Sequence, residues 1–255
     1  MSCEQTFVPR WSFVACIDKK MKNITMNNPE ILYEDRHILC VHKAAGMAVQ
    51  NASTGQMDLE CMLKNYLARK AAGAVSELYV VHRLDQPVEG ILVFAKTKKA
   101  AAGLQKQITE QKMQKQYLAV VEQKVTTKEE TLLEDYLKKD RQMAVVVDKS
   151  APQARQAVLL YTSLDTKEGK SLLKVQLKTG RFHQIRCQLS HAGMPIAGDT
   201  KYGGHKQPGE RGIALCAYSL SFAHPVTGER MHFVHEPVGA AFTVFKEKVA
   251  ELCAQ

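Results

Sequence analysis

The sequence lacks the hydrophobic segments on which membrane proteins and secreted proteins depend. None of its 255 residues belongs to a run approaching the ~18 apolar residues of a membrane-spanning helix. The first twenty residues, MSCEQTFVPRWSFVACIDKK, have no basic start followed by an unbroken apolar stretch, as a secretory signal would. We therefore expect a cytoplasmic protein that does not bind membranes.

Cysteines are too scattered for a disulfide framework or a zinc site. Their number is odd and no two of them form a Cys-x-x-Cys pair. They are Cys3, Cys16, Cys40, Cys61, Cys187, Cys216 and Cys253. His183 and His191 are more than two turns apart on a helix, and we interpret them as hydrogen-bonded polar residues. No metal site is expected.

The sequence also lacks both common glycine-rich nucleotide motifs, Gly-x-Gly-x-x-Gly and the Walker loop. These turns hold the phosphates of dinucleotides and nucleoside triphosphates. A nucleotide-dependent enzyme is therefore not indicated, and we expect no cofactor.

Positive charge is what the sequence has in excess. It contains 35 Lys and Arg residues against 26 Asp and Glu residues, which gives a net charge of +9. Such an excess favours polyanionic partners such as nucleic acid or an anionic membrane surface. Many basic proteins simply carry solvated lysines, so the charge becomes informative only beside a site.

Hydrophobic residues make up 45% of the chain, enough for a proper core. Residues 1–28 have no clear periodicity and are interpreted as an N-terminal extension; residues 29–255 are predicted to form one domain. Strands are expected at 38–42, 78–81, 91–95, 116–122, 158–161, 172–177 and 213–222. Helices are expected at 58–70, at 98–112, from Phe182 to Gly193 and from about Phe242, with surface hairpins and loops at 124–152. Because strands and helices do not alternate regularly, we expect an α+β domain with a mostly antiparallel sheet flanked by helices.

Two segments, 80–97 and 177–204, carry more polar groups than a core needs, between apolar flanks. In the first, Asp85 follows a strand, close to Arg83. In the second, the turn at Thr179-Gly180-Arg181 precedes a helix whose polar face is predicted to carry His183, Gln184 and Arg186. Taken separately, Asp85 could cap a helix or form a surface ion pair, and Arg186 could be an ordinary surface cation.

Together, the two segments resemble the motifs of the RluA-type pseudouridine synthases. The first motif matches His82-Arg83-Leu84-Asp85, Glu89-Gly90 and Phe94-Ala95-Lys96-Thr97. The second matches Lys115-Gln116-Tyr117-Leu118-Ala119-Val120. The third matches Thr179-Gly180-Arg181, His183-Gln184-Ile185-Arg186, Gly193-x-Pro195-Ile196-x-Gly198-Asp199 and Tyr202-Gly203. The resemblance runs from about residue 30 to the end of the chain. Departures are Val88-Glu89 in place of Thr-Ser, Ala45 in place of Pro and Cys216 in place of His.

The resemblance implies an RNA pseudouridine synthase that isomerises uridines in structured ribosomal or transfer RNA and acts as a monomer. It assigns the essential carboxylate to Asp85, the cation beside it to Arg186, and stacking on the target base to Tyr117. Arg83 would fill the gap left by the flipped nucleotide. Further RNA contacts are expected from His82, Arg181, His183 and Gln184. Whether the carboxylate attacks the anomeric carbon or removes a sugar proton stays open.

Two alternative functions compete with this one. A protein of this fold that binds RNA without catalysis would not need Asp85, Tyr117 and Arg186 together. A hydrolase or phosphotransferase using Asp85 should carry a metal cluster or a phosphate-binding loop, and the sequence indicates neither.

Overall fold

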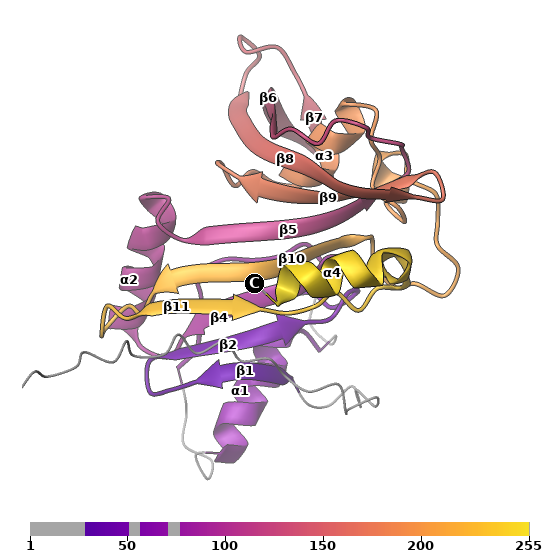
Figure 1. Cartoon of the computed structure of the whole chain (residues 1–255). Coiled ribbons are helices and arrows are strands. Elements are labelled where there is room, and N and C mark those ends of the chain that lie inside the picture. The colour runs from indigo at the N-terminus through magenta and orange to yellow at the C-terminus, as the bar shows by residue number, and fades with distance from the viewer. Residues whose placement is uncertain (1–28, 51–56, 71–76, 255) are drawn as a thin grey trace, which may run out of the picture.

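The computed structural model describes residues 29–50, 57–70 and 77–254, and their strands form one eleven-stranded sheet (Figure 1). The strands are β1 (Glu30–Glu34), β2 (Ile38–Lys43), β3 (Tyr79–Val80), β4 (Glu89–Ala95), β5 (Gln114–Val121), β6 (Thr131–Asp140), β7 (Met143–Val146), β8 (Arg155–Lys167), β9 (Lys170–Leu177), β10 (Leu215–Ala223) and β11 (Arg230–Val234). The helices are α1 (Leu59–Lys70), α2 (Lys98–Thr109), α3 (Gln184–His191) and α4 (Lys246–Cys253), with the 3-10 helices η1 (Thr200–Tyr202) and η2 (Ala240–Phe245). The predicted extension, residues 1–28, lies outside the described residues.

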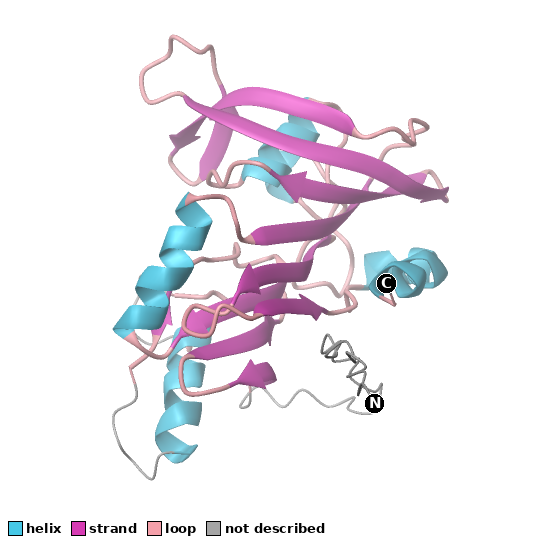
Figure 2. Ribbon diagram, turned by 60° about the vertical axis from the view of Figure 1, so that its left-hand side comes forward, coloured by secondary structure: helices cyan, strands magenta, loops and turns pink. Residues whose placement is uncertain are grey.

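The strand order is β1-β2-β4-β10-β5-β9-β8-β6-β7, with β11 added to β10 and β3 to β4. Among these strands, β4 and β10 form the single parallel pair. Figure 2 shows the strands stacked in a continuous twisted sheet, with α3 beside the upper strands and α1 and α2 along the lower ones. The predicted α+β class and mostly antiparallel sheet are confirmed.

Alternation along the central strands divides the core between the two faces of the sheet. In β2, Leu39 and Val41 belong to one hydrophobic cluster, whereas Ile38 and Cys40 belong to another. This is the period of two expected of a strand that is covered on both faces. The larger cluster contains Tyr117 and therefore lies on the face that carries the candidate site.

Strand β4 separates from β10 soon after it begins, and this opening leaves room for the loop that follows β3. Gly90 pairs with Ala217, and a Cβ at Gly90 would lie only 2.5 Å from that residue's backbone. Further along, Phe94 pairs instead with Val80 of β3. Strand β3 thus enters beside the far end of β4, and the chain leaving it runs toward the point where β4 and β10 meet.

Most predicted elements are present, with some differences. Strands β1 and β11 were not predicted, the expected final helix begins as η2 and continues as α4, and the helix expected from Phe182 begins at Gln184. His183 has a left-handed backbone (φ 52°), which interrupts helical geometry, and Phe182 is 41% exposed. Within the described residues, no helix is long and apolar enough to cross a membrane.

Candidate active site

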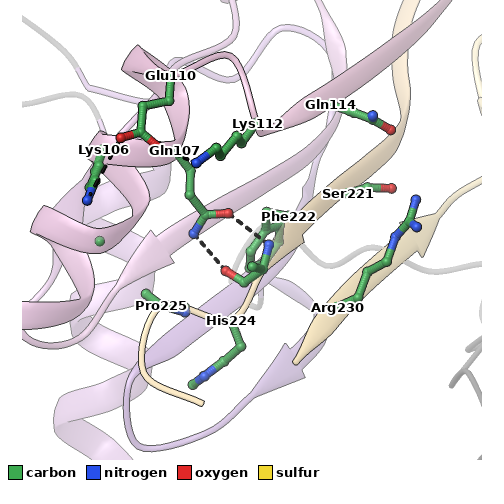
Figure 3. A pocket seen from close by; sticks show the side chains of 12 residues that line it. Lys106, Gln107, Glu110, Lys112, Gln114, Ser221, Phe222, His224, Pro225 and Arg230 are labelled. Atoms are coloured by element: carbon green, nitrogen blue, oxygen red, sulfur yellow. Dashed lines mark hydrogen bonds and ion pairs between the residues drawn. The ribbon is translucent and has the colours of Figure 1, made fainter. Parts of the chain in front are cut away.

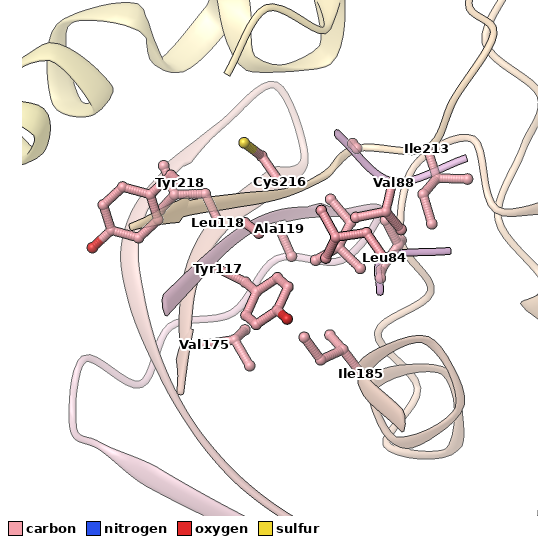
Figure 4. Packing of buried hydrophobic residues seen from close by; sticks show 14 of the residues in the cluster. Leu84, Val88, Tyr117, Leu118, Ala119, Val175, Ile185, Ile213, Cys216 and Tyr218 are labelled. Atoms are coloured by element: carbon pink, nitrogen blue, oxygen red, sulfur yellow. The ribbon is translucent and has the colours of Figure 1, made fainter. Parts of the chain in front are cut away.

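Asp85 lies in a loop whose neighbouring apolar residues anchor it in the core. Leu84 and Val88 are buried in the cluster that also contains Tyr117 (Figure 4). The carbonyl of Asp85 accepts a hydrogen bond from the Val88 amide at 3.0 Å, which closes a tight turn. The sequence thus fixes the loop on both sides of Asp85, and the Asp85 side chain stays 27% exposed.

A buried lysine fastens this loop to the turn after β2. Lys43 is fully buried, and its Nζ donates to the carbonyls of Ala44, Met47 and Gln86 at 2.7–3.1 Å. Burial lowers the pKa of Lys43 to about 7, although the charges of Asp85 and another carboxylate oppose the shift. Because three carbonyls surround the ammonium group, the lysine holds two loops together, including the residue after Asp85.

Arg186 connects Asp85 with a second, fully buried carboxylate. Its Nε and Nη2 donate to Asp199 at 2.7 and 2.8 Å, and its Nη1 donates to Asp85 Oδ2 at 3.2 Å. The side chains of Arg186 and Asp199 are 4% and 1% exposed. A two-point bond of this kind fixes the plane of a guanidinium. Asp199 therefore orients Arg186, and the remaining donor points at Asp85.

His183 lies on the other side of the same carboxylate oxygen. Its Nε2 is 3.6 Å from Asp85 Oδ2, and its Nδ1 is 2.8 Å from the Tyr202 hydroxyl. That hydroxyl already accepts from the Ala144 amide at 2.7 Å, so its own proton is free to point at Nδ1. The arrangement favours the tautomer that carries its proton on Nε2, facing Asp85. Desolvation lowers the pKa of His183 to about 4, so the ring is neutral at pH 7.

Tyr117 lies beneath the loop as part of the apolar floor of the site. It is 6% exposed and packs with Leu84, Val88 and Ile185 (Figure 4). Burial, with a smaller contribution from the charge of Asp85, raises the pKa of Tyr117 well above its usual range. A phenolate is therefore disfavoured here, and Tyr117 presents a ring and a neutral hydroxyl.

A cleft of about 360 Å³ opens beside this constellation. It is lined by Pro87 of the Asp85 loop, by the Arg186–Asp199 pair and by cationic side chains that include Lys201, Lys206 and Arg211. A concave space with convergent polar groups and a basic rim is suited to a nucleotide and its phosphates.

The other predicted site residues discussed here, Arg83, His82 and Arg181, lie in different surroundings. Arg83 is exposed near Asp85. His82 Nε2 accepts from the Val93 amide at 3.1 Å, and burial holds the pKa of His82 well below its usual value, which indicates a neutral ring in a structural setting. Arg181 Nε donates to the Gln156 carbonyl at 2.9 Å.

Gln184 and Arg186 were expected on a polar helix face, and this expectation is wrong because both are 3% exposed. The Gln184 amide binds Thr179 Oγ1, the Arg181 amide and the Val158 carbonyl, at 2.8–3.1 Å. These contacts fasten the turn before α3 to the sheet and favour a structural role for Gln184 over direct contact with RNA.

Sequence reasoning did not assign roles to Asp199, Tyr202 or Lys43, although Asp199 and Tyr202 belong to quoted motif segments. Asp199 and Tyr202 lie in the Gly198-Asp199 and Tyr202-Gly203 pairs that follow α3. A buried arginine in α3 needs a carboxylate partner, and the acidic residue of that nearby motif was the available signal.

Two other polar features lie outside this site. Glu30, His42 and His235 bring ligand-type atoms within 4.8 Å of one another. The two imidazole rings, however, are stacked at 3.8 Å and 12°, so their in-plane lone pairs run side by side and do not converge on one ion. A shallow groove of about 560 Å³ between α2 and the β10–β11 hairpin carries Lys106, Lys112 and Arg230 (Figure 3).

Comparison with known proteins assigns the chain to a family. Residues 37–191 match the model of the RNA pseudouridylate synthases. The chain belongs to the RNA pseudouridylate synthase family. It is 34% identical over 233 residues to the ribosomal large subunit pseudouridine synthase C of Buchnera aphidicola, covering 84% of this chain and 68% of that protein. It is 32% identical to the tRNA pseudouridine synthase C of Vibrio parahaemolyticus, covering 79% of this chain and 87% of that protein.

A solved structure gives the same fold. Human RNA pseudouridylate synthase domain containing 4 has a TM-score of 0.67 at 24% identity, covering 87% of this chain and 93% of that one. The predicted family, the fold and the enzyme class, an RNA pseudouridine synthase, are therefore confirmed. The roles of individual residues remain predictions.

Proposed function

We propose that this chain converts uridine into pseudouridine in ribosomal or transfer RNA, with Asp85 as the carboxylate that acts on the ribose of the target. The observation that carries the proposal is the contact between Asp85 and Arg186. A permanently charged guanidinium, itself fixed by Asp199, keeps one carboxylate oxygen occupied. Among the described residues, no hydrogen bond is formed to the other oxygen, Oδ1, which leaves it available to the substrate.

The reaction needs no external reagent. The bond from uracil N1 to ribose C1′ breaks, the base turns, and a bond from C5 to C1′ forms, while C5 loses a proton and N1 gains one. Asp85 would act as nucleophile at the sugar or as base. The neutral His183 would direct its Nε2 proton toward the carboxylate, and the Tyr117 ring would support the turning base by stacking.

A uridine inside an RNA stack cannot reach these groups, so the nucleotide has to flip out. The cleft beside Arg186 would receive it, and Lys201, Lys206 and Arg211 would bind phosphates. Arg83 would occupy the vacated position in the stack. We further propose that residues 29–255 form the catalytic domain, that the protein acts as a monomer, and that it works in the cytoplasm.

The test uses the purified full chain, treated with EDTA and dialysed, and transcribed ribosomal and transfer RNA labelled with tritium at uridine C5. Tritium release and chromatographic detection of pseudouridine are expected, because the isomerisation exchanges the C5 proton and requires no cofactor. The Asp85→Asn protein, prepared in parallel, controls for contaminating synthases. Tight RNA binding without either product would favour the alternative, an RNA-binding protein of this fold that lacks catalysis.

A further inference from the structure

An exposed aromatic side chain lies at the edge of the site and has no place in the chemistry described so far. Phe182 is 41% exposed, one of five large hydrophobic side chains that are exposed among the described residues. A single exposed apolar residue is common on protein surfaces. Phe182 differs because its ring is stacked on His183, with centroids 3.8 Å apart and planes 20° apart.

The backbone makes this stack possible. Neighbouring side chains point about 100° apart on a helix and to opposite faces on a strand, so adjacent rings do not normally stack. His183 has φ 52° and ψ 26°, a left-handed conformation that few non-glycine residues adopt. This turn of the chain places the rings of Phe182 and His183 face to face.

The stacked rings of Phe182 and His183 lie next to Asp85. His183 Nε2 lies 3.6 Å from Asp85, so Phe182 is separated from the carboxylate by one imidazole ring. The position of that ring is fixed from behind by Tyr202. Whatever stacks on Phe182 therefore lies beside the nucleotide on which Asp85 acts.

A cation accompanies the exposed ring. Lys139 Nζ lies over Phe182, 5.0 Å from the ring centroid, and the lysine is exposed. It projects from β6, where it pairs with Ala144 of β7. The Ala144 amide donates to the Tyr202 hydroxyl, and the Ala144 carbonyl accepts from Cys187 Sγ. The β6–β7 hairpin that carries Lys139 thus contacts, through Ala144, the same tyrosine that holds His183.

We propose that Phe182 and Lys139 bind a nucleotide of the RNA that flanks the target uridine: the base stacks on the ring face opposite His183, and the exposed Lys139 side chain turns aside from that face to contact the phosphate. This inference rests on RNA being the substrate, as proposed above. An aromatic face with an adjacent cation is how proteins bind unstacked bases without reading their sequence. The partner is therefore a single-stranded or locally opened segment of RNA around the modified position.

The direct test is spectroscopic and does not depend on turnover. Trp11 is the single tryptophan of the sequence. In a protein that carries both Trp11→Phe and Phe182→Trp, all tryptophan fluorescence therefore comes from position 182. The probe is a 20-nucleotide oligouridine RNA. Quenching of the tryptophan emission on RNA binding is expected, because a stacked base quenches indole. Unchanged emission at saturating RNA would overturn the proposal.

Affinity for the same probe separates stacking from charge. Phe182→Leu keeps an apolar side chain but no ring, and we expect about ten-fold weaker binding. Lys139→Ala should lower the slope of log affinity against log salt by ~0.7, the value for one phosphate contact on a single strand. Leu132→Ala, which removes another exposed apolar side chain from β6, is the matched control and should bind like the parent.

The outcomes distinguish this inference from the proposed function. Suppose that fluorescence is quenched and the Phe182→Leu protein binds RNA more weakly, but the parent makes no pseudouridine. Nucleotide binding by Phe182 and Lys139 would then be upheld and the catalytic proposal contradicted. Normal pseudouridine formation with unchanged RNA affinity in the Phe182→Leu protein would uphold the catalytic proposal and contradict nucleotide binding by Phe182. Equal melting temperatures of the variants and the parent show that an exposed position was changed without unfolding.

Discussion

Among the groups of carboxylates and histidines in the described residues, the one around Asp85 and the one around Glu30 differ in whether they have the features of a reaction site. In the first, Asp85 contacts Arg186 through one oxygen and stays 27% exposed, and Arg186 lines a cleft. In the second, Glu30 uses both oxygens, toward His42 at 2.8 Å and His235 at 3.2 Å.

A further carboxylate, Glu89, adjoins the second cluster, with its Oε2 4.0 Å from His42 Nε2. Glu89 is 1% exposed, and both of its oxygens accept hydrogen bonds, from the amides of Val238 and Gly239 at 3.2 Å. These bonds fasten the start of β4 to the segment after β11. Residue type alone therefore does not mark the site. The two clusters differ in that Asp85 pairs with a permanently charged guanidinium and keeps one oxygen without a hydrogen bond among the described residues.

The largest expected effect comes from neutralising the first cluster. Asp85→Asn keeps the shape of the side chain but can neither attack nor take a proton. We expect turnover below a few per cent of the parent and RNA affinity within a few-fold, measured by tritium release and by RNA binding. The same exchange in the second cluster, Glu30→Gln, should leave turnover unchanged. Equal losses in both variants would remove the distinction between the clusters.

Arg186 should rank next. Arg186→Ala leaves Asp85 without its orienting partner and Asp199 buried without its own, and misplacement of a reacting group can cost about 100-fold in turnover. Arg186→Lys restores a charge but not the two-point bond to Asp199, so we expect partial rescue. Turnover is read at saturating RNA, and melting temperature separates loss of fold from loss of chemistry. Parent-like kinetics in the Ala variant would mean that another cation serves Asp85.

The sequence was sufficient for the parts of this site that depend on local pattern. The apolar run of β4, the strand that contains Tyr117 and the loop around Asp85 were all predicted, because burial and period specify them. Contacts between distant segments, such as that of Asp85 with Arg186, came only from the family resemblance. A single sequence contains no information on which distant residues meet.

The wrong predictions for the start of α3 and for the burial of Arg186 have a common physical cause. The predicted helix begins at Phe182, but the left-handed backbone of His183 delays its start by two positions, to Gln184. Periodicity placed Arg186 on a polar surface, because a buried arginine and an exposed one look alike until the buried carboxylate that pairs with it is located. Backbone exceptions and buried ion pairs are the features that local pattern does not reveal.

Replacing Arg83 should slow the reaction to an extent that depends on the RNA substrate. If its side chain fills the gap left by a flipped uridine, Arg83→Ala should slow modification of a stacked uridine far more than that of one already unstacked. The reason is that unstacking costs a few kcal/mol only where the base begins stacked. The measurement compares rates on two RNAs with the same target in a duplex and in an open loop. An equal loss on both would make Arg83 a simple phosphate contact.

The smallest expected effect lies in the second cluster and concerns stability. Hydrogen bonds from His235 and then from His42 hold the pKa of Glu30 well below its ordinary value of 4.5. A carboxylate with a depressed folded-state pKa contributes stability that is fully present above its unfolded pKa and is lost as pH falls through the folded one. Because Glu30 is 39% exposed, solvent screens the contribution, and Glu30→Gln should lower the melting temperature at pH 7 by only ~2–4 °C. That difference should shrink steadily below about pH 4.5, as the parent loses the charge that the variant never had. A gap that widens on acidification would show that Glu30 is not the acceptor joining the two histidines, and the separation of a structural from a reactive cluster would need to be redrawn.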